Sequence, residues 1–428
     1  MIYAAMIQSQ LGKDAPYSWY LFDCAKRHSR YDGDSFREQA RATEAYLDAC
    51  TVAAAHGEDL MAWFDRDDWG SLFVLLVVAM RRDDQALLAQ AFGQIRADSP
   101  TDVEEIKDAF LWQPYPRFDH YWAALFQQDN DVAKQAAMAI SRSQGQALPA
   151  RLMEAVEQMT HPGLLGEYCQ RLGERRRSDK LPYVQSLYQH PDTGLRFAAA
   201  KAGKRLGDPQ VNPLLQQHLL SETAYTLEAL ELFFINAPVD RLHHWLRNLR
   251  DREKAGVSPR VRCYAIAVAG LAEWVDELFP LMVEPEYARV AGEAFTLLTG
   301  IGIEEDGLDA KVSGCQDCQQ PQGDSAAGAA EPADDLTLSE RRQTDPFISD
   351  WEDDLPYPCP DATQQWWERH KGNFSAGQRY LAGKTLTVEN LQQVYQTGNQ
   401  RQRYLAALYL SINHQKSWRD PRWPPFWI

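Results

Sequence analysis

Hydrophobic residues recur at helical spacing most clearly between residues 191 and 220. One face of the first helix there consists of Leu195, Ala198, Ala202 and Leu206. This spacing of three or four residues predicts a helix, and Gly207 should end it because glycine adopts the left-handed conformation at little cost. Asn212 and Pro213 then suit a cap and a first helical position. The inward face of this second helix is expected to hold Leu214, Leu215 and Leu219.

A weaker version of the same unit recurs along the chain. A basic residue followed three positions later by a small one occurs at Lys134, Arg196, Arg262, Arg289 and Arg403. The first two steps, of 62 and 66 residues, are each twice a period of about thirty, and turn or cap formers precede each copy. Stacked helical hairpins of this period are typical of an α-solenoid. We therefore expect an all-α fold of HEAT-like hairpins, with an irregular helical domain as the alternative.

Other structural classes lack support in the sequence. No convincing stretch alternates apolar and polar residues between hairpin turns, as strands do. The longest apolar run, Leu72–Met80, is nine residues long and is followed by two arginines, whereas a membrane span needs about twenty. The first residues also lack the basic region of a signal peptide. We expect a soluble, cytoplasmic chain without a membrane partner.

Charge is concentrated in one segment. The chain carries 60 acidic and 44 basic residues, a net charge of −16. Residues 301–362 hold 16 acidic and three basic residues, so they contribute −13 and the remaining residues only −3. Nucleic-acid binding needs lysine and arginine gathered on one face, so no nucleic-acid partner is expected. The segment also holds five glycines and six prolines, a composition that predicts disorder.

These patterns predict four parts of the chain. Residues 1–39 form an N-terminal extension, 40–300 the helical solenoid, 301–362 the acidic linker, and 363–428 a C-terminal helical segment. The last part ends in a tail rich in tryptophan and proline, which suits an extended segment laid across a groove. Within the linker and the tail, we assign partner binding to Glu352, Asp353, Asp354, Trp423 and Trp427.

No catalytic or metal-binding motif stands out. Cys315 and Cys318 have the spacing of a zinc-ligand pair, but a structural site needs a second close pair, so chance linker thiols are the better interpretation. The seven cysteines are scattered and odd in number, as expected for reduced cytosolic thiols. A nucleophile elbow, a Walker loop and a dinucleotide fingerprint are all missing from the sequence. We expect no cofactor, no metal and no enzymatic activity.

Several polar residues allow a functional or a structural interpretation, and we favour the structural one. His243 and His244 are adjacent in a helical stretch, so one should face a neighbouring repeat and the other solvent. Arg196, Arg262 and Arg289 could hold an acidic partner or pair with carboxylates of the next repeat.

An aromatic patch around His120, which includes Trp112, could form a ligand groove, but packing of a core between repeats is the better interpretation. Glu104 and Glu105 lie near a helix start, where the helix dipole favours acidic side chains. Neither carboxylate needs a general-acid role.

Five motifs together connect the chain to a known family. They are RATEAYL at 41–47 with Gly57, AFLW at 109–112, DTGLRFAA at 192–199 with LGD at 206–208, EDDLPYPCP at 352–360 before Trp366 and Trp367, and FSAGQRYL at 374–381 with QRQR at 400–403. Over most of residues 40–412 the chain resembles a family of proteobacterial HEAT-repeat proteins often encoded among type VI secretion genes. The resemblance implies a repeat scaffold that works with secreted effectors or spike components, and it supplies no catalytic residues.

Two functions fit these observations. The first is an adaptor or chaperone whose helical surface holds a secretion effector or spike component. The second is an immunity protein that occludes a cognate toxin, with the acidic segment blocking a basic cleft by charge complementarity. An enzyme of unknown reaction is a weaker third alternative.

Overall fold

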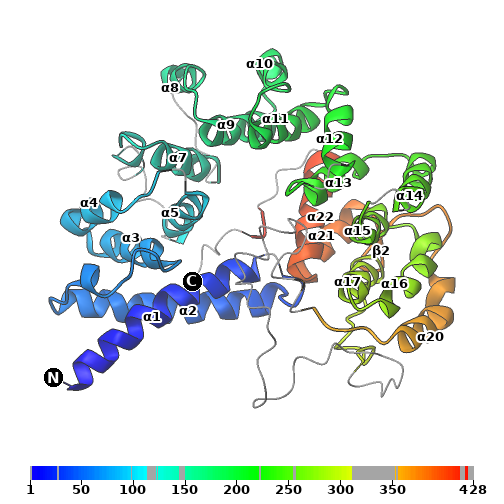
Figure 1. The fold of residues 1–428 in the computed structure, drawn as a ribbon, viewed down its shortest axis with the longest axis horizontal. Coiled ribbons are helices and arrows are strands. Elements are labelled where there is room, and N and C mark those ends of the chain that lie inside the picture. Colours follow the sequence, from blue (N-terminus) through cyan, green and yellow to red (C-terminus); the bar gives the residue numbers. More distant parts are fainter. Residues whose placement is uncertain are drawn as a thin grey trace. The chain divides into compact units, whose positions relative to one another are not determined.

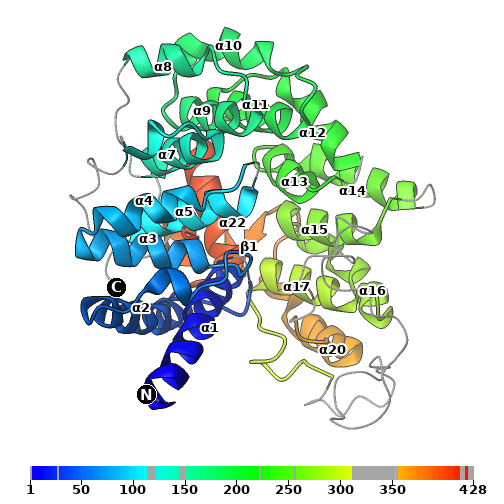
Figure 2. The same ribbon diagram turned by 60° about the vertical axis from the view of Figure 1, so that its left-hand side comes forward.

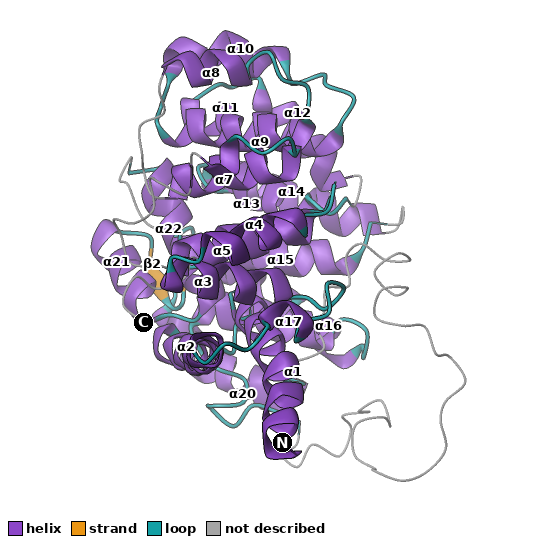
Figure 3. Ribbon diagram, turned by 90° about the vertical axis from the view of Figure 1, so that its left-hand side faces the viewer, coloured by secondary structure: helices purple, strands orange, loops and turns teal. Residues whose placement is uncertain are grey.

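The computed structural model describes residues 2–26, 28–97, 99–112, 122, 124–143, 150–220, 223–253, 257–310, 352, 355–414 and 420–422. Helices dominate these residues (Figure 3). The strands among them form one short antiparallel pair, β1 (Tyr380–Leu381) and β2 (Lys384–Thr385). The all-α class predicted from the hydrophobic spacing is confirmed.

Contacts divide the chain into two compact units. The first consists mainly of the described residues up to 26 and from 33 to 211. The second consists of residues 28–32 and the described residues from 212 to 421. The solenoid expected over one continuous range is thus shared between two units.

The first unit is a succession of stacked helices (Figure 1). In chain order its elements are α1 (Ile2–Ala25), α2 (Gly33–Ala55), the 3-10 turn η1 (Leu60–Ala62), α3 (Ser71–Arg82), α4 (Gln85–Gly93), α5 (Pro100–Trp112), α7 (Asp131–Ser143), α8 (Ala150–Val156), α9 (Pro162–Glu174), the 3-10 turn η2 (Ser178–Lys180), α10 (Leu181–Ser186) and α11 (Thr193–Leu206). Within this set, α3 packs on α5, α5 on α7, α7 on α9, and α9 on α11. Such nearest-neighbour stacking is the arrangement of a helical repeat array.

The N-terminal residues belong to this unit and are not an extension. Phe22 of α1 stacks on Phe36 of α2 with ring centroids 5.0 Å apart. Trp19 of α1 lies 5.9 Å from Phe73 of α3, measured between ring centroids, and both α1 side chains are buried. The boundary expected at residue 39 therefore falls inside α2 and is corrected, because the large apolar side chains of α1 are covered by α2 and α3.

The helix predicted after residue 191 is present as α11. Asp192 caps it by accepting a hydrogen bond from the Leu195 N–H at 2.7 Å. Gly207 ends it in the left-handed region, with φ of 81°, as expected. The next helix, α12 (Val211–Leu220), begins two residues before Pro213, which was expected to be its first helical position.

Small residues let α9 and α11 approach closely. A Cβ placed on Gly173 of α9 would lie only 2.8 Å from the Cα of Ala202 in α11. One placed on Gly166 would touch the Cβ of Ala198 at 3.4 Å. Figure 2 shows the two helices side by side. The apolar face recognised in the sequence of α11 is therefore packed directly on α9.

The second unit begins within α12 and is also helical. Its further elements are α13 (Thr226–Phe234), α14 (Val239–Glu253), α15 (Pro259–Ala269), the 3-10 turn η3 (Ala272–Glu277), α16 (Phe279–Val283), α17 (Ala288–Thr299), α20 (Pro360–His370), the 3-10 turn η4 (Lys371–Asn373), the two strands, α21 (Val388–Thr397) and α22 (Gln400–Ile412). Helix α15 packs on both α13 and α17, and α21 packs on α22. The stacking of neighbours is therefore repeated in this unit.

The β1–β2 hairpin lies across the carboxyl ends of α15 and α17. The Tyr380 N–H donates to the Gly270 carbonyl at 2.8 Å, and the Ala382 N–H donates to the Leu297 carbonyl at 2.8 Å. The guanidinium of Arg379, just before β1, donates to carbonyl oxygens at the ends of α13 and α15. A cation is favoured at these helix ends, where carbonyl oxygens lack helical partners.

Both ends of the expected acidic linker are packed. The Ala310 N–H donates to the Tyr357 carbonyl at 2.9 Å, and the Cys359 N–H donates to the Leu308 carbonyl at 2.7 Å. Leu308 and Cys359 are buried. Disorder over the whole of 301–362 is therefore corrected, because backbone pairing and apolar burial order its two ends. Most of the residues between these ends lie outside the described part of the chain.

Candidate interaction surface

The structure describes one of the residues assigned to partner binding, Glu352. Its carboxylate is buried and forms a hydrogen-bonded ion pair with the Arg260 guanidinium of α15, inside the second unit. A buried, paired carboxylate is not accessible to a partner, so the expectation for Glu352 is corrected. The remaining assigned residues lie outside the described part of the chain: Asp353, Asp354, Trp423 and Trp427.

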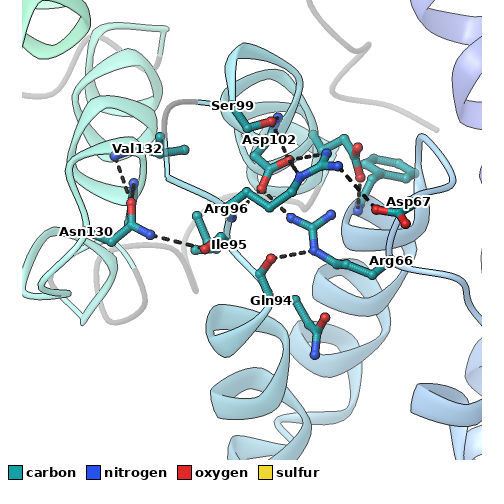
Figure 4. A network of polar contacts seen from close by, with 12 residues as sticks. Arg66, Asp67, Gln94, Ile95, Arg96, Ser99, Asp102, Asn130 and Val132 are labelled. Atoms are coloured by element: carbon teal, nitrogen blue, oxygen red, sulfur yellow. Dashed lines mark hydrogen bonds and ion pairs between the residues drawn. The ribbon is translucent and has the colours of Figure 1, made fainter.

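A polar network joins α5 to the segments before it (Figure 4). Its centre is Asp102, in the first turn of α5, which is fully buried. One carboxylate oxygen accepts from the Arg66 guanidinium and, at 2.8 Å, from the Arg96 backbone N–H. The other accepts from the Arg96 guanidinium and the Ser99 hydroxyl, each at 2.7 Å. The Arg66 guanidinium also donates to the Gln94 carbonyl.

This network binds two positive charges to Asp102. Burial alone would raise the pKa of Asp102, but the hydrogen bonds from Arg96 and Ser99 and the charge of Arg66 hold the pKa below its ordinary value of 3.8. The carboxylate is therefore ionised at neutral pH. Both guanidinium groups bind this carboxylate, and the partly exposed Arg96 also lies 3.8 Å from exposed Asp67.

Glu105, three residues further along α5, accepts a hydrogen bond from a different helix. Its Oε2 accepts from the backbone N–H of Phe73 at the start of α3, at 3.1 Å. Burial raises the pKa of Glu105 to about 7, and its Oε1 has no hydrogen-bond partner. From the sequence, the dipole of its own helix was expected to account for the position of Glu105. In the structure its carboxylate instead binds the start of α3.

Asp108, the third buried carboxylate of α5, binds α1 and the residue that follows it. Its Oδ2 accepts from the Lys26 ammonium and, at 3.1 Å, from the indole Nε1 of Trp19. Burial alone would lower the pKa of Lys26, but the charges of Asp108 and Asp23 raise it above its ordinary value. The three buried carboxylates of α5 thus each connect this helix to a different neighbouring segment. We interpret these three carboxylates as structural.

The adjacent histidines diverge as predicted. The Trp274 Nε1 donates to His243 Nδ1 at 2.8 Å, whereas His244 is exposed. Arg262 pairs with Glu277 of η3 at 2.7 Å, so it has a carboxylate partner within the fold.

The other two arginines of that prediction also have internal contacts. Arg196 donates to carbonyl oxygens just before its own helix, and the Arg289 guanidinium lies 4.9 Å from the Tyr357 ring centroid. Trp112, from the predicted aromatic patch, packs edge-on against Phe22 at 4.9 Å between centroids. Its role in a core is confirmed.

No metal or membrane chemistry is found in the described part of the chain. There, histidine, cysteine, aspartate and glutamate form no group of three that could hold a metal ion. Among the same residues, no helix combines the length and the apolar character that a bilayer crossing requires. Cys315, Cys318 and His120 lie outside the described residues.

Aromatic side chains gather at the surface of the first unit. The rings of Tyr17 and Tyr20 on α1 lie 5.9 Å apart, and Tyr20 lies 5.6 Å from Trp69, two residues before α3. Tyr17 is 57% exposed and Trp69 41% exposed. Asp67 and Asp68 are exposed beside Trp69 in the chain. We call these five residues the aromatic–acidic surface. This surface was not predicted from the sequence, because α1 was assigned to an extension and the loop before α3 was not connected to it.

Comparison with protein families finds HEAT repeats over residues 149–231. The matched range begins just before α8 and ends within α13, and it includes the hairpin that was the clearest repeat in the sequence. Searches of curated proteins and of solved structures give no significant match. The stacked helices and the matched range agree that this chain carries HEAT repeats.

Proposed function

We propose that this chain is a protein-interaction scaffold without catalytic activity of its own. The observation that carries the proposal is the match to HEAT repeats over 149–231, together with the stacking of neighbouring helices within each unit. Repeats of this kind present extended surfaces, and proteins built from them commonly bind other proteins. The buried carboxylates of α5 support the same view, because their hydrogen bonds join segments of the fold.

The finer proposal is that the partner is an effector or a spike component of a type VI secretion system. It rests on the resemblance of the motifs between residues 41 and 403 to HEAT-repeat proteins encoded among such genes. In this role the chain would act as an adaptor or chaperone. The partner would be held during loading, and no reaction would be required.

The alternative is an immunity protein that occludes a toxin. The specific observation in its favour is the net charge of −13 over residues 301–362, which would complement a basic cleft. The two roles differ in what happens when the protein is missing. Loss of an adaptor stops delivery, whereas loss of an immunity protein poisons the cell that makes the toxin.

The test is capture of the tagged full-length chain from its own cells, with quantitative mass spectrometry and metal analysis of the eluate. A spike or effector protein in stoichiometric amount, with normal growth of the deletion strain, would support the adaptor. A single toxin that kills the deletion strain would support immunity. An eluate without a protein partner but with stoichiometric metal would overturn the scaffold proposal.

A further inference from the structure

We propose that the aromatic–acidic surface of Tyr17, Tyr20, Asp67, Asp68 and Trp69 binds an arginine- or lysine-bearing segment of a protein partner. This inference rests on the proposed scaffold function and adds to it a location and a partner chemistry. It is carried by exposure of the rings, by the backbone that holds them and by the local distribution of charge.

The aromatic part is a continuous set of rings. Tyr17 and Tyr20 are nearly parallel, with an angle of 26° between their planes, and Trp69 continues the set beyond Tyr20. Isolated exposed apolar side chains are ordinary, but a contiguous exposed group marks an interaction site more often than chance. Tyrosine and tryptophan are also the residues most enriched at the energetic centres of protein interfaces.

The position of Trp69 is fixed by its neighbours in the chain. Gly70 has φ of 91° and packs against the backbone of Pro16 in α1, so that an added Cβ would overlap the Pro16 carbonyl. The Asp67 N–H donates to the Asp65 carboxylate at 3.0 Å, which closes a turn in the same loop. The tryptophan is therefore presented by a defined backbone next to α1. A preorganised surface loses less entropy on binding.

The loop before α3 is negatively charged at its surface, and Lys13 of α1, four residues before Tyr17, is an exposed cation near it in the chain. Asp67 and Asp68 are exposed, and the Asp67 side chain is 90% exposed. Arg66, which lies between them and η1 in the chain, donates instead to buried Asp102. Arg96 also binds Asp102 and reaches Asp67 only at 3.8 Å. Exposed carboxylates therefore outnumber exposed cations in the loop that carries Trp69.

This combination fits a cationic side chain. An arginine guanidinium stacks on tryptophan and tyrosine rings and pairs with carboxylates at the same time. Nucleic acid and anionic lipid would be repelled by Asp67 and Asp68. A symmetric contact of two copies centred on this surface would bring like charges close together. The observations therefore favour a basic protein segment over the other occupants.

The test uses the full-length chain and two short synthetic peptides, one of alternating glycine and arginine and one of alternating glycine and glutamate. Binding is measured by titration calorimetry at low and at moderate salt. We expect the arginine peptide to bind more weakly as salt rises and the glutamate peptide not to bind. Paired replacement Tyr17→Ala with Trp69→Ala should weaken binding of the arginine peptide about tenfold or more.

Paired replacement Asp67→Asn with Asp68→Asn should weaken binding about fivefold and reduce its salt dependence. The matched control, Glu154→Gln with Glu284→Gln, removes two exposed carboxylates that are not part of the aromatic–acidic surface and should leave the affinity unchanged. Thermal unfolding of every variant checks that the fold is retained, as expected for exposed side chains.

Equal affinity of all variants for the arginine peptide, or no binding of that peptide, would overturn the proposal. Light scattering that showed dimers dependent on Trp69 would assign the surface to a second copy and would also overturn it. The scaffold function is judged separately by capture from cells. A partner that is still captured by the Tyr17→Ala, Trp69→Ala chain would leave the scaffold in place and reject only this surface.

Discussion

Single carboxylates in α5 show how position decides the chemistry of a side chain. Asp102 and Glu105 lie three residues apart and are both buried. Asp102 accepts hydrogen bonds from two arginines, and its pKa is lowered, whereas burial dominates at Glu105 and raises its pKa to about 7. The two residues should therefore affect stability in different ranges of pH.

For Glu105, stability should fall as pH rises. The unfolded chain releases this proton near pH 4.5, and the folded chain keeps it until about pH 7. Between these values the folded state binds more protons, so the free energy of unfolding decreases by about 3 kcal/mol for this group. Glu105→Gln should remove this slope in urea unfolding measured at several pH values. A variant that keeps the full slope would show that another group is responsible, and Glu154→Gln is the control.

For Asp102, the free energy of unfolding should depend on pH in the opposite direction. Its lowered pKa stabilises the fold above its ordinary value of 3.8, and this contribution is lost as pH falls further. Asp102→Asn leaves Arg66 and Arg96 facing a neutral amide and should lower the free energy of unfolding at neutral pH by about 2–4 kcal/mol. Urea unfolding at pH 7 measures this loss. A change below about 0.5 kcal/mol would show that the network contributes little.

Single residues were predictable from the sequence where only the direction of a side chain was in question. His243 and His244 diverge, and Arg262 pairs with a carboxylate. The role of Glu105 was not predictable, since an acidic residue near a helix start looks the same in the sequence whether it faces solvent or a neighbouring helix. Asp102 and Asp108 gave no signal of their own. Their partners lie up to 89 residues away in the chain, as in the contact between Trp19 and Asp108.

At the scale of elements, the hairpin over α15 and α17 depends on two glycines. Gly270 and Gly300 end these helices with φ of 66° and 79°. Each also lies against hairpin backbone, and a Cβ on Gly300 would lie 2.6 Å from the Ala382 carbonyl oxygen. These positions therefore combine a left-handed backbone with a close approach.

Replacement of Gly300 by alanine should lower the free energy of unfolding by about 3 kcal/mol, because backbone strain and a clash with the hairpin add. The control is Gly207→Ala, at a helix end with φ of 81° but nothing within 4 Å of the added Cβ. It should cost about 1 kcal/mol. Urea unfolding of both variants measures the difference. Equal losses of unfolding free energy would show that the hairpin can shift to accommodate the added methyl group.

The helix ends explain which elements were predictable. Asp192 and Gly207 bound α11 as the sequence indicated, because caps are local signals. The hairpin was not foreseen, since each strand has two residues and its hydrogen bonds reach helices about 80–110 residues earlier. Local chemistry is readable in the sequence, whereas pairing between distant segments is not.

At the scale of the whole molecule, the acidic segment is packed at both ends, and its middle lies outside the described residues. Deletion of residues 311–350 leaves every described contact in place, including the pairing of Ala310 with Tyr357. The melting temperature should therefore stay within about 2 °C of the full chain, as differential scanning calorimetry would show. Deletion of 307–350 also removes buried Leu308 and should lower the melting temperature clearly. Equal effects of the two deletions would contradict this division.

The fold class was predictable because periodic burial of one helix face extends through the chain. The division at residues 211 and 212 was not predictable, since helices continue across it. The interaction surface was missed for a similar reason, because Tyr17 and Trp69 become neighbours only after α1 packs beside the loop before α3.

The scaffold account is best tested by the mass of the complex that the full-length chain forms in its own cells. Native mass spectrometry of the gently purified, tagged chain should show a heteromeric assembly of fixed stoichiometry with a protein partner. The mass should exceed the 48.7 kDa of the chain by that of the partner. A single species at the mass of the chain alone, under conditions that preserve known complexes from the same cells, would contradict the account.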